Sequence, residues 1–190
     1  MPDKRRPRPR PPGDGLKRRV EEMLRVDHAG EYGAVAIYRG QQAVLARARK
    51  TRGTARTLNE MEREEQRHLE AFDTLLNERQ VRPTALAPVW NAAGFALGAA
   101  TALLGERAAH ACTEAVETVI EQHYQSQVDE LEAAGEEPEL AKTFAEFRAE
   151  ELNHRDEAVN LGAKDAPGYP LLAAFIRAGC RAAIKVSEKV

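Results

Sequence analysis

The stretch Glu-Glu-Gln-Arg-His, residues 64–68, returns as Glu-Glu-Leu-Asn-His at residues 150–154, 86 positions further along the chain. Each copy contains a Glu-x-x-His motif. Positions i and i+3 of an α-helix share one face, so the Glu and the His of each motif can bind the same metal ion. The repeated motif therefore predicts two helices that contribute ligands to a common metal site.

The same shift of 86 positions relates a second set of residues. It carries Tyr38 onto Tyr124, Gln41 onto Gln127 and Leu45 onto Leu131. Each half also has a single Glu that stands 34 residues before its Glu-x-x-His motif, and this completes the ligand set of di-iron and di-manganese four-helix carboxylate proteins. The predicted metal ligands are Glu31, Glu65, His68, Glu117, Glu151 and His154.

The corresponding ligands of the two halves are expected to have the same roles. Glu31 and Glu117 are expected as terminal ligands, the two motif glutamates as bridging ligands, and the two motif histidines as one nitrogen donor for each metal. Such carboxylate-rich ligation suits iron or manganese and gives zinc little advantage. For one Glu-x-x-His the better explanation would be solvated surface side chains. Two copies on otherwise apolar helix faces favour a metal site, because burying an unpaired carboxylate is costly.

Several neighbours of these ligands are candidates for supporting roles. Glu64 and Glu150 are candidate acceptors for the ring N–H groups of the motif histidines, with plain surface glutamates as the alternative. Tyr124 is a candidate catalytic residue with a redox or substrate-positioning role, and core packing is its alternative. Three further histidines lack a partner at matching spacing, and their roles stay open: His28, His110 and His123.

Length and composition place the chain among ordinary helical domains. With 190 residues, 28 basic and 30 acidic, the protein is one domain, and its balanced charge argues against nucleic-acid binding. The two cysteines form no disulfide framework. Residues 1–15 hold five prolines and five basic residues, which predicts a disordered basic tail before a domain over residues 16–190.

The apolar periodicity predicts a long helix over about residues 16–50, a break at residues 52–54 and a second helix that follows to about residue 80. It also predicts helices over about residues 105–134 and 138–161, and a last amphipathic helix over residues 170–188. Pro83 should end the second helix, and Pro138 should stand in the first turn of the fourth.

Residues 85–104 form a long uncharged run. A single membrane span there would place the two halves on opposite sides of the bilayer, yet both halves must meet at the metal site. The run is therefore expected to lie within the protein or in the membrane interface, with Trp90 at the depth of the headgroups. The last helix carries a basic ridge typical of a membrane-surface helix, with packing on the bundle as the alternative: Arg177, Arg181, Lys185 and Lys189.

Together these segments resemble a known family. RVDHAGEYGAVAIYRGQ (25–41), RPTALAPVWNAAGFALGAATALLG (82–105), ACTEAVE (111–117), EELNH (150–154) and AGCRAAI (178–184) are similar to the demethoxyubiquinone hydroxylases of ubiquinone biosynthesis. The resemblance covers roughly residues 20–190 and includes all six ligand positions. It implies an all-α, ferritin-like four-helix bundle built from two pseudo-repeats, with an apolar interfacial segment and a C-terminal amphipathic helix.

The resemblance also implies an activity. The expected enzyme is a di-iron monooxygenase that uses two iron ions and O2 to hydroxylate the ring of a polyprenylated demethoxy-ubiquinol or quinone. NADH is the expected electron source, although the sequence has no Gly-rich dinucleotide loop. Expected partners are the lipid quinone, the membrane surface and an accessory lipid-binding protein, and no nucleic acid.

The first residues of the chain favour a bacterial over a mitochondrial location. The Pro/Arg-rich leader does not resemble a mitochondrial presequence, which favours a peripheral protein on the cytoplasmic face of a bacterial inner membrane over the matrix face of the mitochondrial inner membrane. The competing classes are an iron-storage or ferroxidase protein with no lipid substrate, and a lipid-binding helical module whose metal site is vestigial.

Overall fold

A computed structural model describes residues 12–189, and in this range the protein consists of helices and short connections without a strand. The all-α prediction is confirmed. In chain order the elements are α1 (Pro12–Leu45), η1 (Arg49–Thr51), α2 (Arg52–Glu78), α3 (Ala87–Leu103), α4 (Glu106–Ala134), α5 (Pro138–Asn160), η2 (Ala163–Asp165) and α6 (Tyr169–Ser187).

The helix ends follow the local chemistry of the sequence. Gly135 ends α4 with a positive φ of 66°, a conformation that glycine adopts at little cost. Pro138 opens α5 in the first turn, as predicted. The first helix differs from the expectation, because it begins at Pro12 and ends at Leu45, and a 3₁₀ turn occupies the segment expected to be its end. Most of the predicted disordered tail, residues 1–11, lies outside the described residues.

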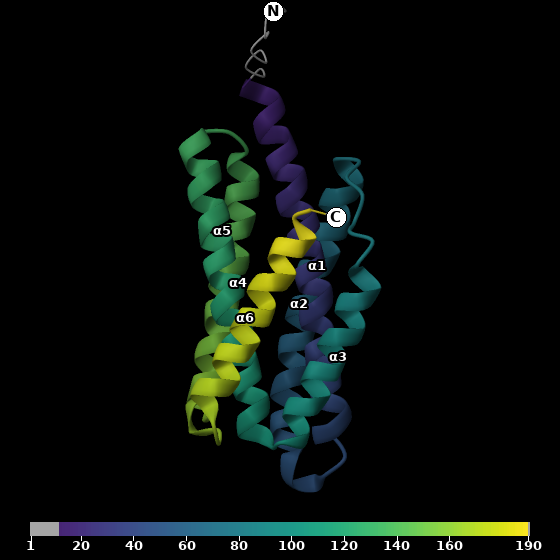
Figure 1. The fold of residues 1–190 in the computed structure, drawn as a ribbon, viewed down its shortest axis with the longest axis vertical. Coiled ribbons are helices and arrows are strands. Elements are labelled where there is room, and N and C mark those ends of the chain that lie inside the picture. Colours follow the sequence, from purple (N-terminus) through teal and green to yellow (C-terminus); the bar gives the residue numbers. More distant parts are fainter. Residues whose placement is uncertain (1–11, 190) are drawn as a thin grey trace, which may run out of the picture.

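Two helical hairpins form the bundle. α1 packs against α2, and α4 packs against α5. The two hairpins stand side by side, with α3 along the outside of α1 and α6 running diagonally across the bundle (Figure 1). This arrangement brings helices from both halves of the chain around one core.

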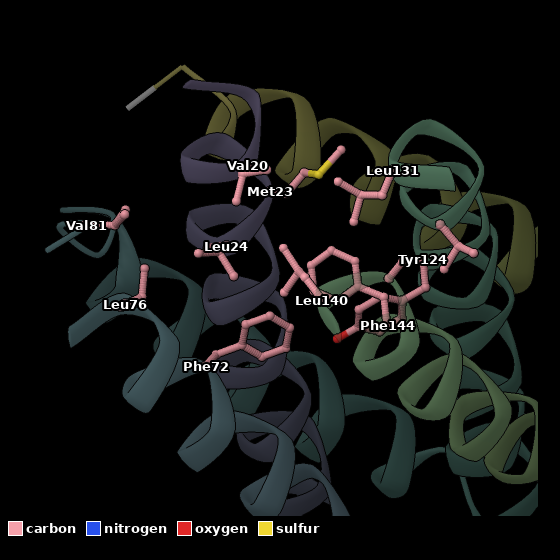
Figure 2. Packing of buried hydrophobic residues seen from close by; sticks show 12 residues of the cluster. Val20, Met23, Leu24, Phe72, Leu76, Val81, Tyr124, Leu131, Leu140 and Phe144 are labelled. Atoms are coloured by element: carbon pink, nitrogen blue, oxygen red, sulfur yellow. The ribbon is translucent and has the colours of Figure 1, made fainter. Parts of the chain in front are cut away.

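Aromatic side chains from three helices fill the core at one end of the bundle. Phe72 of α2, Tyr124 of α4 and Phe144 of α5 point toward one another, with ring centroids 5.7–6.5 Å apart, and Leu24 of α1 completes the cluster (Figure 2). Because all four side chains are almost fully buried, this cluster fixes the rotation of each bundle helix about its axis.

The apolar run forms α3, which lies directly against the backbone of α1. A Cβ atom added to Gly98 would stand 2.0 Å from the carbonyl oxygen of Ile37, and one added to Gly40 would stand 2.2 Å from that of Phe95. Glycine is therefore required on both sides of this contact. α3 and the residue that follows it expose large apolar side chains, among them Val89, Phe95 and Leu103 of the helix and Leu104 after it. No helix within residues 12–189 has the length and apolarity needed to cross a bilayer.

The contacts of α6 correct one expectation. Arg177, predicted as part of a basic ridge facing lipid headgroups, turns inward instead. Its Nη2 atom donates to both carboxylate oxygens of the buried Glu114, at 2.6 and 2.8 Å, and the Tyr169 hydroxyl donates to the same carboxylate at 3.0 Å. Burial of Glu114 makes this pairing more favourable than exposure of Arg177, since an unpaired buried carboxylate would be costly. Arg181, Lys185 and Lys189 of the expected ridge are exposed.

Candidate metal centre

The structure brings together all six residues that the repeated motif singled out. Each bundle helix supplies one or two of them, and none has more than 2% of its surface exposed. Their donor atoms form two groups in which the atoms lie within 4.8 Å of one another: Glu31, Glu65, His68 and Glu151 in one group, and Glu65, Glu117, Glu151 and His154 in the other. Glu65 and Glu151 belong to both groups, at the centre of the arrangement.

The histidines approach the shared glutamates through their Nδ1 atoms. His68 Nδ1 lies 3.1 Å from Glu151 Oε1, and His154 Nδ1 lies 3.1 Å from Glu65 Oε1. Each histidine thus contacts the glutamate of the other half more closely than its own motif partner, which stands at 3.7 Å from His68 and at 3.4 Å from His154. This reciprocity is what the doubled motif requires of a pseudo-twofold site.

The donor atoms at the centre are buried and have no hydrogen-bond partner. These atoms are both carboxylate oxygens of Glu65 and of Glu151, one oxygen each of Glu31 and Glu117, and the Nδ1 atoms of His68 and His154. Buried polar atoms in proteins are nearly always hydrogen-bonded or bound to an ion. A convergent set of such atoms, rich in carboxylate oxygen with one imidazole per group, fits a pair of iron or manganese ions.

The outer nitrogens of the two histidines bond to the carboxylates expected from the sequence. His68 Nε2 lies 2.9 Å from Glu150 Oε2, and His154 Nε2 lies 2.6 Å from Glu64 Oε2. The expected contact is confirmed, and in both cases the acid comes from the other half of the chain. An Nε2–H bond to a carboxylate leaves the Nδ1 lone pair directed at the centre, as a metal ligand needs.

The two tyrosines also form hydrogen bonds with residues of the opposite half of the chain. The Tyr38 hydroxyl donates to Glu117 at 2.7 Å, and the Tyr124 hydroxyl donates to Glu31. Burial and the adjacent carboxylates raise the pKa of both phenols well above the usual value, so both stay protonated donors. Each phenol therefore holds one of the two outermost glutamates in place.

Burial and crowding of the carboxylates shift the pKa values of the centre. Burial raises the pKa of Glu31 to about 7 and the pKa of Glu117 well above its usual value. Burial alone would lower the pKa of His154, but its contacts with Glu151 and Glu65 outweigh burial and raise the pKa to about 12. The pKa of His68 rises for the same reason. Without a cation, this centre therefore retains protons.

One polar contact near the centre was not expected from the sequence. Asp27 is buried one turn before Glu31, and its Oδ1 atom lies 3.0 Å from His123 Nε2 and 3.0 Å from Gln127 Nε2. The spacing of four residues from Glu31 was the available signal, because it places Asp27 on the same helix face. The shift of 86 gives no acid at the matching position, which is Thr113.

The other two open histidines lie apart from the six donors. His28 Nε2 stands 3.0 Å from Asp73. His110 is buried, and burial lowers its pKa, so that it stays neutral. Neither residue belongs to the two groups of converging donors found within the described range.

An apolar cavity of about 340 Å³ lies between α1, α3, α4 and α6. Its α1 wall includes Gly30, directly before Glu31, and its α4 wall includes Val116, directly before Glu117. Trp90 of α3 and Phe175 of α6 line it from the outside. The helices that carry the glutamates therefore also form the wall of a lipophilic space.

An all-α bundle with a buried set of glutamates and histidines that can hold metal defines a class of helical metalloprotein. Within it, the family described as "Ubiquinone biosynthesis protein COQ7" matches residues 18–187, and the chain belongs to this family. A 3-demethoxyubiquinol 3-hydroxylase of Rhodospirillum rubrum is 50% identical over 171 residues, 90% of this chain and 78% of the relative. The family expected from the sequence is confirmed.

Eukaryotic relatives align over a similar length. The human NADPH-dependent 3-demethoxyubiquinone 3-hydroxylase, mitochondrial, is 46% identical over 173 residues, 90% of this chain and 78% of the relative. The Saccharomyces cerevisiae 5-demethoxyubiquinone hydroxylase, mitochondrial, is 38% identical over 184 residues, with the same coverage of 90% and 78%. The chain is thus similar to hydroxylases from both bacteria and mitochondria.

Proposed function

We propose that this protein is a di-iron monooxygenase that adds a hydroxyl group to the ring of a polyprenylated demethoxy-ubiquinol or quinone. The observation that carries the proposal is the pair of donor groups sharing Glu65 and Glu151, whose four carboxylate oxygens are buried and unpartnered. The names of the relatives support the choice of substrate.

The six donor residues would have different roles in binding the metal. Two iron ions would be held by Glu65 and Glu151, which belong to both donor groups, with Glu31 and His68 in one group and Glu117 and His154 in the other. When bound, reduced iron supplies electrons to O2, so that one oxygen atom enters the ring and the other leaves as water. The protein holds the ions, excludes bulk water and orients the ring.

The residues around the donors perform the orienting. Glu64 and Glu150 fix the tautomer and rotation of the two histidines. Tyr38 and Tyr124 donate to the terminal glutamates and so limit the rotamers available to them. Tyr124 remains our candidate for a further redox or substrate-positioning role.

We propose that the lipid quinone binds in the apolar cavity beside α1 and α4. We place its isoprenoid tail between α1, α3 and α6, where the lining is almost entirely hydrocarbon. The exposed apolar side chains of α3 and α6, such as Phe95 and Leu171, would contact the membrane surface from which the substrate comes.

The proposed function also includes a location, a partner and an electron source. The chain acts at the cytoplasmic face of a bacterial inner membrane, or at the matrix face of the mitochondrial inner membrane, with an accessory lipid-binding protein as partner. Electrons come from a reduced nicotinamide. NADH is our expectation from the sequence, whereas the human relative bears NADPH in its name.

A single-turnover experiment tests the proposal. Protein loaded with two ferrous ions per chain is mixed with O2 and a prenylated demethoxyquinol, and hydroxylated product is quantified. We expect product in the wild type and none in Glu65→Ala or Glu151→Ala, whose helical content should persist. Rapid iron oxidation with no product would favour the ferroxidase class. Quinone binding with no stoichiometric iron would favour a lipid-binding module.

A further inference from the structure

Apart from Gly94, which packs against α1, three glycines inside helices line the apolar cavity. Gly30 and Gly33 lie on α1, and Gly179 lies on α6. A glycine inside a helix destabilises it relative to alanine, because glycine loses more backbone entropy on folding. The presence of three such residues around one space calls for a physical reason.

Close packing is not that reason. A Cβ atom added to Gly30, Gly33 or Gly179 would meet no atom within 4 Å outside its own helix backbone and chain neighbours. The glycines of the α1–α3 contact differ sharply, since a Cβ on Gly94 would stand 2.6 Å from the carbonyl oxygen of Gly33. Helix packing therefore requires glycine at Gly94 and leaves alanine sterically acceptable at the three cavity positions.

The helical glycines with open space at the Cβ position occur only at particular places within the range from residue 15 to residue 189. Between residues 15 and 189, the other helical glycines with open space around the Cβ position are Gly15 and Gly53, which lie in the first turn of α1 and of α2. Glycine within the first turn has less effect on helix stability. Inside the helices, open glycine positions thus coincide with the cavity wall.

We infer that Gly30, Gly33 and Gly179 determine the width of the cavity and thereby allow it to accept a quinone whose tail is a branched isoprenoid. This inference rests on the proposed function and makes the substrate class of its cavity specific. An isoprenoid chain carries a methyl branch on every fourth carbon of its backbone and is wider than a straight alkyl chain. A methyl group added to the wall would obstruct a branched tail and still admit a straight one.

Trp90 provides a direct measurement of binding. It is the only tryptophan of the chain and lines the cavity, so a quinone bound there should quench its fluorescence. Two probes share one demethoxyquinone ring, and one carries a diprenyl tail while the other carries a decyl tail. Dissociation constants are determined for the full chain without iron and without turnover.

We expect Gly33→Ala and Gly179→Ala to raise the dissociation constant of the diprenyl probe about tenfold, the size of effect that one methyl group has in an apolar pocket. The decyl probe should change by less than about twofold, since its chain lacks the branches that the new methyl would meet. Gly53→Ala is the matched control, because its Cβ position is also open and lies outside the cavity. It should bind both probes as the wild type does.

Three results would overturn the inference. Unchanged binding of the diprenyl probe would show that the glycines do not set the width, and an equal loss of both probes would show that they do not select branching. A variant that failed to fold would contradict the open space at these positions. If the alanine variants lose only the diprenyl probe while the iron-loaded wild type forms no hydroxylated product, the proposed function is contradicted and this inference stands.

Discussion

The Nε2 atom of His68 lies 2.9 Å from a carboxylate oxygen of Glu150, a residue 82 positions further along the chain. The reciprocal pair, His154 and Glu64, is related by the same internal repeat and lies 2.6 Å apart. A helix of one half therefore positions the histidine of the other half. The consequences of this exchange, and of the packing around it, can be measured.

Removal of the outer acids should weaken metal binding without unfolding the protein. We expect Glu150→Ala and Glu64→Ala each to lower iron affinity by about 10- to 100-fold, because the histidine loses the partner that fixes its tautomer. Iron per chain after dialysis against a competing chelator provides the measurement. Glu146→Ala changes an exposed acid of the same helix as Glu150 and serves as the control. Equal iron retention in all three variants would contradict the role of Glu64 and Glu150.

The two tyrosines separate a positioning role from a catalytic one. Tyr38 and Tyr124 donate equivalent hydrogen bonds, so Tyr38→Phe and Tyr124→Phe should reduce iron affinity to a similar degree. If Tyr124 also acts in the reaction, only Tyr124→Phe should lower single-turnover product formation in fully loaded protein, by about tenfold or more. Equal rates for the two loaded variants would restrict Tyr124 to positioning.

Stability of the metal-free protein should decrease as pH rises. The pKa of Glu31 is about 7 in the folded state against 4.5 for the ordinary carboxyl, and that of His154 is about 12 against 6.5. A raised folded-state pKa means that the folded protein binds more protons, so its contribution is present below the ordinary pKa and is lost as pH rises toward the folded one. From pH 6 to about pH 7 both groups act in this direction, and above pH 7 His154 continues to do so. We expect Tm to fall by roughly 5 °C over this range.

Bound metal should counteract this loss of stability at higher pH. Ligands must lose protons to bind metal, so the increase in Tm caused by ferrous or manganous ion should grow between pH 6 and pH 8.5. Thermal unfolding with and without the ion, in the same buffers, measures both slopes. A metal-free protein that becomes more stable with rising pH would contradict the proton-retaining centre.

The α1–α3 contact should tolerate no side chain at Gly98. Gly98→Ala would place a Cβ 2.0 Å from the carbonyl oxygen of Ile37, and we expect a loss of about 1–3 kcal/mol in the free energy of unfolding. Gly53→Ala, where the space is open, should be neutral or stabilising by about 0.5–1 kcal/mol. Urea unfolding followed by circular dichroism compares the two. Similar stabilities would mean that the helices can move apart at no cost.

Vesicle binding should depend on both apolar and basic groups. Phe95→Glu on α3 and Leu171→Glu on α6 should release the protein from anionic vesicles, because these side chains are 44% and 80% exposed. Salt should weaken binding by wild type without abolishing it. Arg181→Gln should reduce the salt dependence, whereas Arg177→Gln should mainly destabilise α6, since Arg177 pairs with Glu114. Ala145→Glu on α5 is the control, and release by that variant would contradict the assignment of the membrane face.

The sequence predicted the helices and the donor set because both depend on spacing along one element. The i, i+3 relation places Glu65 and His68 on one face whatever surrounds that helix. The contacts between halves could not be predicted in the same way, because spacing shows that Glu150 is near the inward face but not which histidine it meets. The structure supplies that partner.

Arg177 shows most clearly which contacts could not be predicted from spacing along the sequence. Its spacing of four residues from Arg181 predicted a common exposed ridge, and the partner that draws it inward lies 63 positions away in α4. Glu114 itself reads as one more glutamate of a Glu-rich helix, and only the packing of α6 on α4 shows that it is buried. Periodicity gives the direction of a side chain, while burial of a charge depends on which helices meet.

The reciprocal bonds between His68 and Glu150 and between His154 and Glu64 make each half incomplete alone. A chain ending after α2 would have a histidine with no outer acid and an acid with no histidine. Two copies of such a chain, related by a rotation of 180°, would satisfy both. The reciprocal pattern of these contacts is therefore the one expected if two half-length chains were joined into one polypeptide, with α3 as the connection.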